Sequence, residues 1–139
     1  MLVILNTNVL ISALLCSDGT LARLLDAWEH RLFTLVCCDE IIAELREVAT
    51  RAFFKRRLSS GSATSLAVEL RAFSVCFADL LSGPIAPDPK DSFLLALAET
   101  SRANFLVTGD KELLALKRHR STRIIAPAGM FELLKKAEP

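Results

Sequence analysis

Four polar residues of this 139-residue chain lie beside apolar segments in a pattern that could assemble a hydrolytic site. Asn6 and Asp110 each follow a short apolar run. Asp91 precedes an apolar helical segment, and Glu44 lies about one turn into another. Oxygen ligands without convergent His or Cys favour hard cations such as Mg²⁺ or Mn²⁺. Such a cation activates water and stabilises charge on a phosphate, so the pattern predicts hydrolysis of a phosphodiester.

Each of these residues also has an ordinary structural interpretation. Asp91 and Asp110 suit the N-caps of helices, because Asp is a favoured capping residue after a loop. Glu44 suits an exposed helical position, and Asn6 suits a turn or a cap. Three carboxylates in one cleft repel each other unless a cation neutralises them. Taken singly the structural interpretations are favoured, whereas the grouping of all four favours a metal site, and spacing alone leaves both open.

Alternating strands and helices must position these side chains. Strands are predicted at 2–5, 33–38, 73–77, 104–107 and 123–126. Helices are predicted at 9–15, 21–30, 39–48, 63–72, from 91 onward, 111–117 and 128–136. This alternation implies parallel pairing with right-handed crossovers. We therefore predict an α/β fold, a three-layer α/β/α sandwich around a central parallel sheet of about five strands, in one domain spanning 1–139. Ligands bind such sheets beyond the carboxyl ends of the strands, where the four residues are expected.

Composition narrows the class of protein without naming a function. Hydrophobic residues make up 52% and charged residues 24%, which excludes a disordered chain. The net charge of +1 neither selects nor excludes a nucleic-acid partner. The four cysteines form no C-x-x-C pair, so we expect buried thiols rather than a zinc cluster or disulfides. No signal peptide or membrane span is recognisable, so a cytoplasmic location is predicted.

Four stretches of the sequence resemble the PIN domain family, in particular the VapC-like single-domain toxins of bacterial and archaeal toxin–antitoxin pairs. The stretches are MLVILNTNVLISALL at 1–15, CDEIIAELREV at 38–48, APDPKDSFLLALAETSRANFLVTGDKELLAL at 86–116 and RIIAPAGMFELL at 123–134. They keep the family's motif order over nearly the whole chain. The resemblance implies a PIN-like fold and a ribonuclease that depends on one or two Mg²⁺ or Mn²⁺ ions. It also implies an RNA substrate, a cognate antitoxin and a homodimer.

The resemblance also assigns roles to individual positions. It implies that the metal-binding and catalytic positions are Asn6, Glu44, Asp91 and Asp110. Polar residues that support these ligands in the family fall on Thr7, Asn8 and Thr108, and Asp88 lies where it could help to bind a second ion.

One of these positions departs from the family motif. The motif usually reads D-T-N, whereas this chain has Asn6-Thr7-Asn8. An amide oxygen can still contact a cation, but the lost negative charge should weaken metal binding. Three alternatives stay open. The chain is a natural but weakened nuclease, or an inactive PIN-fold module that binds RNA or an antitoxin, or an enzyme silenced by a deliberate Asp→Asn change. A structure-specific DNA nuclease ranks last, because the short chain lacks a helical arch.

Two basic clusters, at 51–57 and 117–123, are expected to hold phosphates of an RNA backbone. The alternative is that they are solvated surface charges. Lys111, beside Asp110, is expected to contact the scissile phosphate, and we expect no base-stacking aromatic platform in either cluster. Apolar surface on the helices at 21–30 and 63–72 is expected to serve a dimer or antitoxin interface. The cluster residues selected as RNA-binding candidates are Arg56, Arg57, Lys117 and Arg118.

Overall fold

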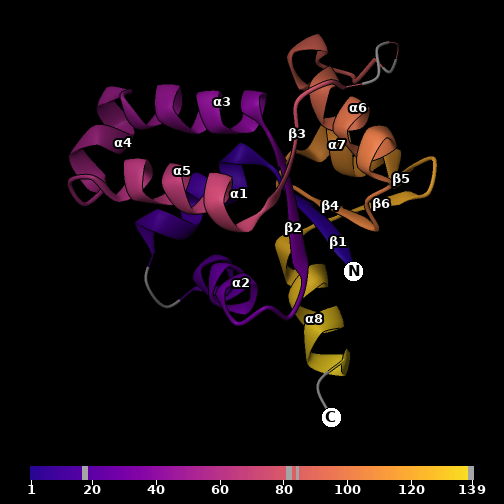
Figure 1. Cartoon of the computed structure of the whole chain (residues 1–139), viewed down its shortest axis with the longest axis horizontal. Coiled ribbons are helices and arrows are strands. Elements are labelled where there is room, and N and C mark those ends of the chain that lie inside the picture. The colour runs from indigo at the N-terminus through magenta and orange to yellow at the C-terminus, as the bar shows by residue number, and fades with distance from the viewer. Residues whose placement is uncertain (17–18, 81–82, 84, 138–139) are drawn as a thin grey trace.

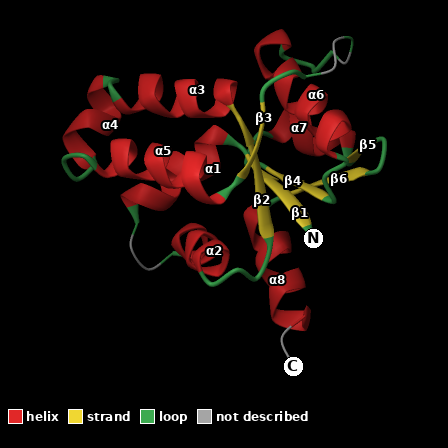
Figure 2. Ribbon diagram, viewed as in Figure 1, coloured by secondary structure: helices red, strands yellow, loops and turns green. Residues whose placement is uncertain are grey.

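The computed structural model describes residues 1–16, 19–80, 83 and 85–137. Within this part of the chain, a six-stranded sheet has the strand order β3-β2-β1-β4-β6-β5 (Figure 1). Helices lie on both sides of the sheet, which confirms the predicted α/β sandwich (Figure 2). The strands are β1 (Leu2–Leu5), β2 (Thr34–Cys38), β3 (Val75–Phe77), β4 (Phe105–Val107), β5 (Arg118–His119) and β6 (Thr122–Ile125).

Five of the six strands are parallel, as the alternation of strands and helices predicted. β1 pairs with β2 and β4, β2 pairs with β3, and β4 pairs with β6, all in parallel. β5 is the exception, because it forms an antiparallel hairpin with β6 that the sequence analysis missed. A strand of two residues is too short to show a period of two, so no sequence pattern could have revealed it.

The helices form the outer layers of the sandwich. α6 contacts β2, β3 and β5, whereas α1, α3 and α5 pack together on the other side of the sheet (Figure 1). The carboxyl ends of β1 and β4 therefore open between these two groups of helices. The helices are α1 (Thr7–Leu15), α2 (Thr20–Glu29), α3 (Asp39–Ala49), α4 (Ala52–Arg57), α5 (Ser62–Phe73), the 3-10 helix η1 (Pro89–Asp91), α6 (Ser92–Ser101), α7 (Lys111–Leu116) and α8 (Pro127–Ala137).

The central strand β1 is held rigidly by the core. Val3, Ile4 and Leu5 are all buried, as expected for a strand covered on both faces. Leu45 on α3 and Leu97 on α6 are fully buried as well, so the core lies on both sides of the sheet. The residue that follows β1 is thereby fixed at the edge where a ligand would bind.

The prediction of a strand over 73–77 was wrong at its start. α5 continues through Phe73, and the strand begins only at Val75. The helix ends at Ser74, whose backbone N–H and side-chain hydroxyl both donate to the Leu70 carbonyl oxygen. Phe73 is aromatic and therefore typical of strands, but these local hydrogen bonds keep it in the helix.

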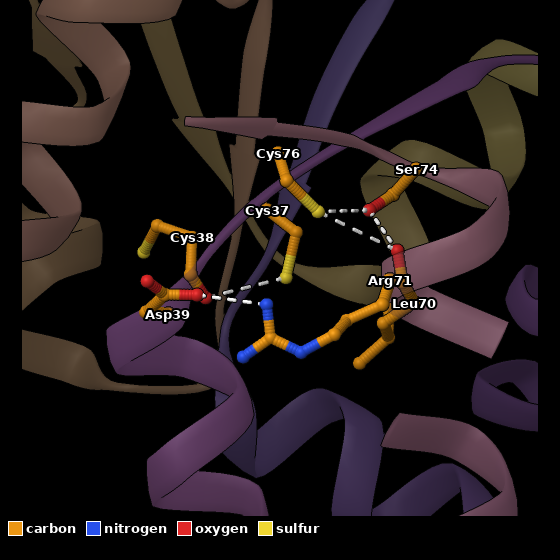
Figure 3. A network of polar contacts seen from close by, with 7 residues as sticks. All are labelled: Cys37, Cys38, Asp39, Leu70, Arg71, Ser74 and Cys76. Carbon is orange, nitrogen blue, oxygen red and sulfur yellow. Dashed lines mark hydrogen bonds and ion pairs between the residues drawn. The ribbon is translucent and has the colours of Figure 1, made fainter. Parts of the chain in front are cut away.

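Two of the four cysteines contradict the expectation of buried thiols. Cys37 and Cys38 are buried on β2, whereas Cys16 at the end of α1 and Cys76 on the edge strand β3 are exposed. Burial raises the pKa of both Cys37 and Cys38 to about 12, so these thiols are neutral at physiological pH. The Ser74 hydroxyl lies 3.4 Å from the Cys76 sulfur (Figure 3).

Across the described ranges, no single helix is both long and apolar enough to cross a membrane, and only the bent pair α1 and α2 passes that test together.

Candidate functional site

A cavity of about 280 Å³ lies beside the carboxyl ends of β1 and β4, between α1, α3 and the starts of α6 and α7. The four residues grouped by the sequence analysis, Asn6, Glu44, Asp91 and Asp110, all line it. The structure therefore brings these side chains together at the expected edge of the sheet. The full lining is Asn6, Thr7, Asn8, Ile11, Glu44, Val48, Arg51, Phe54, Asp91 and Asp110.

Asn6 is held by hydrogen bonds of its backbone N–H and of both polar atoms of its side chain. Its backbone N–H donates to the Val107 carbonyl oxygen of β4 at 3.0 Å, which ties the end of β1 to its neighbour. Its Oδ1 accepts from the Thr7 backbone N–H at 2.7 Å and caps α1, while its Nδ2 donates to Thr108 Oγ1 at 3.0 Å. The capping interpretation is thus correct for Asn6, and the capping oxygen keeps a second lone pair for another ligand.

Thr108 links Asn6 to the other side of the cavity. It is fully buried, and its Oγ1 accepts from the Asp110 backbone N–H at 3.1 Å as well as from Asn6. Asp110 in turn caps α7, because its Oδ1 accepts from the Glu112 N–H at 2.8 Å. One carboxylate oxygen of Asp110 is therefore held by the helix, while Oδ2 makes no such capping bond.

Asp91 has no such capping role. It lies at the end of η1 and precedes α6, but its side chain makes no capping hydrogen bond. Burial, together with the negative charges of Asp110, Asp88 and Glu44, raises the pKa of the Asp91 carboxyl to about 6. The structural interpretation therefore fails for Asp91. Its carboxylate lies near three others in a site that disfavours negative charge.

Thr7 adds an unpartnered polar atom to this cavity. The residue is 2% exposed, and its Oγ1 has no hydrogen-bond partner within the described protein. Buried hydroxyls are almost always satisfied by protein, water or a ligand. The start of α1 therefore offers a hydroxyl that a bound ligand or its hydration water would complete.

The donor set fits a hard divalent cation. Within residues 1–16, 19–80, 83 and 85–137, no three His, Cys, Asp or Glu side chains lie close enough together to hold an ion by themselves. Mg²⁺, however, is usually bound by one or two carboxylates, with waters and substrate phosphates completing its shell. Asp91 and Asp110 provide such a pair, because both line the cavity and the charge of Asp110 contributes to the raised pKa of Asp91.

The remaining predicted residues lie around the cavity or away from it. Asp88 caps η1 by accepting from the Lys90 N–H at 3.0 Å; it influences Asp91 by charge without lining the cavity. Lys111 follows Asp110 at the start of α7 and does not line the cavity either. Arg56 and Arg57 lie on α4, whereas Lys117 and Arg118 lie beyond the far end of α7, about 9 Å along its axis.

The structure adds Arg51 and Phe54 to the cavity wall. Arg51 belongs to the basic cluster at 51–57 that was expected to hold phosphates, but it was not selected among the RNA-binding candidates, and Phe54 was not a candidate at all. The expectation of no base-stacking platform assumed that no aromatic residue interleaves with the basic clusters, and this assumption was wrong. Phe53 and Phe54 lie between Arg51 and Lys55 in the sequence, and Phe54 reaches the cavity.

A family model described as PIN domain matches residues 2–112, which include every residue that lines the cavity. No curated protein is significantly similar to the chain.

Proposed function

The chain belongs to the PIN domain family and has its nuclease-type fold, and from this premise we propose that it is a divalent-metal-dependent endoribonuclease. Members of the family are commonly nucleases that use divalent metal ions. One observation carries the proposal for this chain. Asp91, Asp110 and Glu44 line one cavity, and the charges of Asp110 and Glu44 contribute to the raised pKa of Asp91. Negative charges this close repel each other unless a cation or a proton lies between them.

Asp91 and Asp110 would hold a Mg²⁺ or Mn²⁺ ion, with Glu44 and the Asn6 amide oxygen as further oxygen ligands. When bound, the cation supplies activation of water and neutralisation of charge on the phosphate. The protein's own contribution is positioning. Thr108 fixes the Asn6 amide and the Asp110 backbone through one hydroxyl. The capping bond to Glu112 fixes one oxygen of Asp110.

We expect Asn6 to weaken the binding of a cation at this site. An Asp at this position would add a negative charge beside Asp91 and Asp110, and affinity for a hard cation rises with the charge of its ligands. The presence of Asn6 where the family usually has Asp also favours a second candidate function, an inactive PIN-fold module that binds RNA or an antitoxin. Both Asn6 side-chain groups already have protein partners, and the amide cannot act as a base.

We further propose that the protein is the toxin of a toxin–antitoxin pair and forms a homodimer. The sequence resemblance to single-domain toxins supports the first point. The exposed apolar side chains of α5 support the second, since Val68 is 59% and Phe73 72% exposed. Light scattering tests the dimer, and a monomer throughout the micromolar range would contradict it.

Cleavage of a labelled RNA pool in Mn²⁺ tests the proposed activity. The comparison includes this chain, Asn6→Asp, and Asn6→Asp combined with Asp91→Ala. We expect Asn6→Asp to cut RNA, the double variant to be inactive and a chelator to abolish cleavage. Cleavage by the unchanged chain would identify Asn6 as a tolerated ligand. If all three proteins are folded and none cuts a broad RNA pool, the enzyme proposal is wrong and the binding module is favoured.

A further inference from the structure

The lining of the cavity runs from the carboxylates to Arg51 and Phe54. These two residues lie where α3 and α4 meet at a corner (Figure 1). α3 ends at Ala49, and the chain turns through Thr50 and Arg51 before α4 begins at Ala52. Arg51 and Phe54 line the end of the cavity formed by this corner, while Asp91 and Asp110 line the other end. Glu44 lies more than one turn before the end of α3, whereas Arg51 follows that end. The corner therefore lies beyond the carboxylates, where a neighbouring nucleotide of a bound strand would lie.

Arg51 is held in place by Glu47 but keeps free donors. Its Nε donates to Glu47 Oε1 at 3.2 Å, and its Nη2 donates to Oε2 at 2.8 Å. These bonds use two of the five N–H groups of the guanidinium. The arginine side chain remains 60% exposed. A fixed guanidinium with three free donors at the cavity wall is suited to a phosphate.

The two phenylalanines of α4 provide aromatic surface beside this arginine. Their rings meet edge to face, with centroids 5.0 Å apart and planes at 78°. Phe54 is partly buried against the core, which fixes its ring, and it also lines the cavity. Phe53 is 52% exposed, and the Arg57 guanidinium lies 3.8 Å from its centroid. Packing against the core explains the buried part of Phe54, but it does not explain the exposed Phe53 ring beside it on a helix with three basic residues.

We propose that Arg51 and Phe54 form a subsite for the nucleotide next to the scissile phosphate, an inference that rests on the proposed ribonuclease function. The Phe54 ring stacks on the base and Arg51 holds the adjoining phosphate. A base can stack on a side chain only when it is unstacked from its neighbours, as in single strands, loops and bulges. Every base has a π-face, so the subsite selects unpaired RNA rather than a particular sequence.

Binding of RNA without metal tests this subsite independently of cleavage. Fluorescence anisotropy in chelator would compare a short single-stranded RNA with an abasic strand of the same length. Phe54→Leu keeps an apolar side chain against the core, and we expect it to weaken binding of the normal strand by about fivefold or more. Binding of the abasic strand should be unchanged. Phe131→Leu is the matched control, because Phe131 is also partly buried against the core and lies beside basic side chains, but it lies outside the cavity.

Arg51→Gln should behave differently from Phe54→Leu. It should weaken binding of both strands and reduce the slope of log affinity against log salt by about 0.7, as expected for one lost phosphate contact with a single strand. Phe54→Trp keeps an aromatic face and gives a direct signal. Its fluorescence should be quenched by the normal strand and not by the abasic strand.

Three results would contradict the account in distinguishable ways. If this chain binds RNA and Phe54→Leu binds the normal strand as tightly as the unchanged chain does, the stacking subsite is wrong while the proposed function stands. Equal weakening of both strands by Phe54→Leu, or no quenching in Phe54→Trp, would also overturn stacking. If the unchanged chain binds neither strand even at low salt, both the subsite and the RNA-directed function are wrong.

Discussion

At the scale of single residues, structural and functional roles coexist on the same side chains. Asn6 caps α1 and Asp110 caps α7, and both also line the cavity. A cap engages one oxygen and leaves the rest of the group available, so a capping role does not exclude a ligand role. Asp91 is different, because it makes no capping bond and its charge is opposed by three neighbouring carboxylates.

The raised pKa of Asp91 predicts a pH dependence of stability in the metal-free protein. Its pKa is about 6 in the folded state against an ordinary 3.8, so the folded state binds the proton more tightly. Stability should therefore fall as the pH rises from about 4 through about 6. Asp91→Asn removes this loss. In chelator, the variant should gain stability over the unchanged chain at pH 7.5 and not at pH 4.

Urea unfolding at the two pH values measures this effect, with Asp79→Asn as a control at an exposed position outside the cavity. A stability difference between Asp91→Asn and the unchanged chain that is equal at pH 4 and pH 7.5 would show that the Asp91 carboxyl is not held in an unfavourable site.

At the scale of elements, α3 positions the site from the edge of its buried face. Ile41, Ile42 and Leu45 are buried in the core, and Val48, which packs partly against the same core, lines the cavity together with Glu44. The period of the apolar residues predicted this helix and its buried face. The corner after it could not be predicted, because the direction of α4 depends on tertiary packing rather than on local propensity.

Leu45→Ala tests whether α3 is anchored in the core through Leu45. Leu45 is fully buried, so the substitution should reduce the free energy of unfolding by about 2–5 kcal/mol. Chemical denaturation measures the loss, and Val48→Ala, at a half-buried position on the cavity side, should cost clearly less. Equal costs at the two positions would mean that α3 is not anchored through the Leu45 face.

The difference between local sequence patterns and tertiary packing also explains which other features the sequence could predict. Asn6 and Asp110 were located correctly because short apolar strands end visibly at polar residues, and parallel strands bring those ends to one edge. Phe73 was misassigned because its strand propensity was overridden by the hydrogen bonds that end α5. Phe54 was missed because a helix of six residues is too short for the spacing of its apolar residues to show whether a side chain faces the core or a cavity.

At the scale of the whole molecule, the two basic clusters have different surroundings. Arg51 at the first cluster lines the cavity. In the second cluster, on the β5–β6 hairpin, His119 and Arg120 both contact Glu99 on α6, and the hydrogen bond from Arg120 lowers the pKa of that glutamate. Arg123 lies over the Phe105 ring at 5.7 Å. These contacts favour the structural interpretation of the second cluster.

Neutralising single charges in the two clusters should therefore have unequal effects on RNA. Arg51→Gln should weaken binding of single-stranded RNA more than Arg118→Gln, because only Arg51 lies at the cavity. Anisotropy titrations at several salt concentrations measure both affinities and their salt slopes. A larger loss for Arg118→Gln would move the RNA path to the β5–β6 side of the sheet.

We propose that the cavity holds a divalent cation through Asp91 and Asp110, and that Asn6 lowers the affinity for this cation. Calorimetric titration with Mn²⁺ tests this claim directly, without RNA. We expect weak binding by the unchanged chain, binding tighter by about tenfold or more for Asn6→Asp, and no measurable binding when Asp91→Asn is added. If Asn6→Asp binds no Mn²⁺ while folded, or still binds it after Asp91→Asn, the cavity is not the metal site.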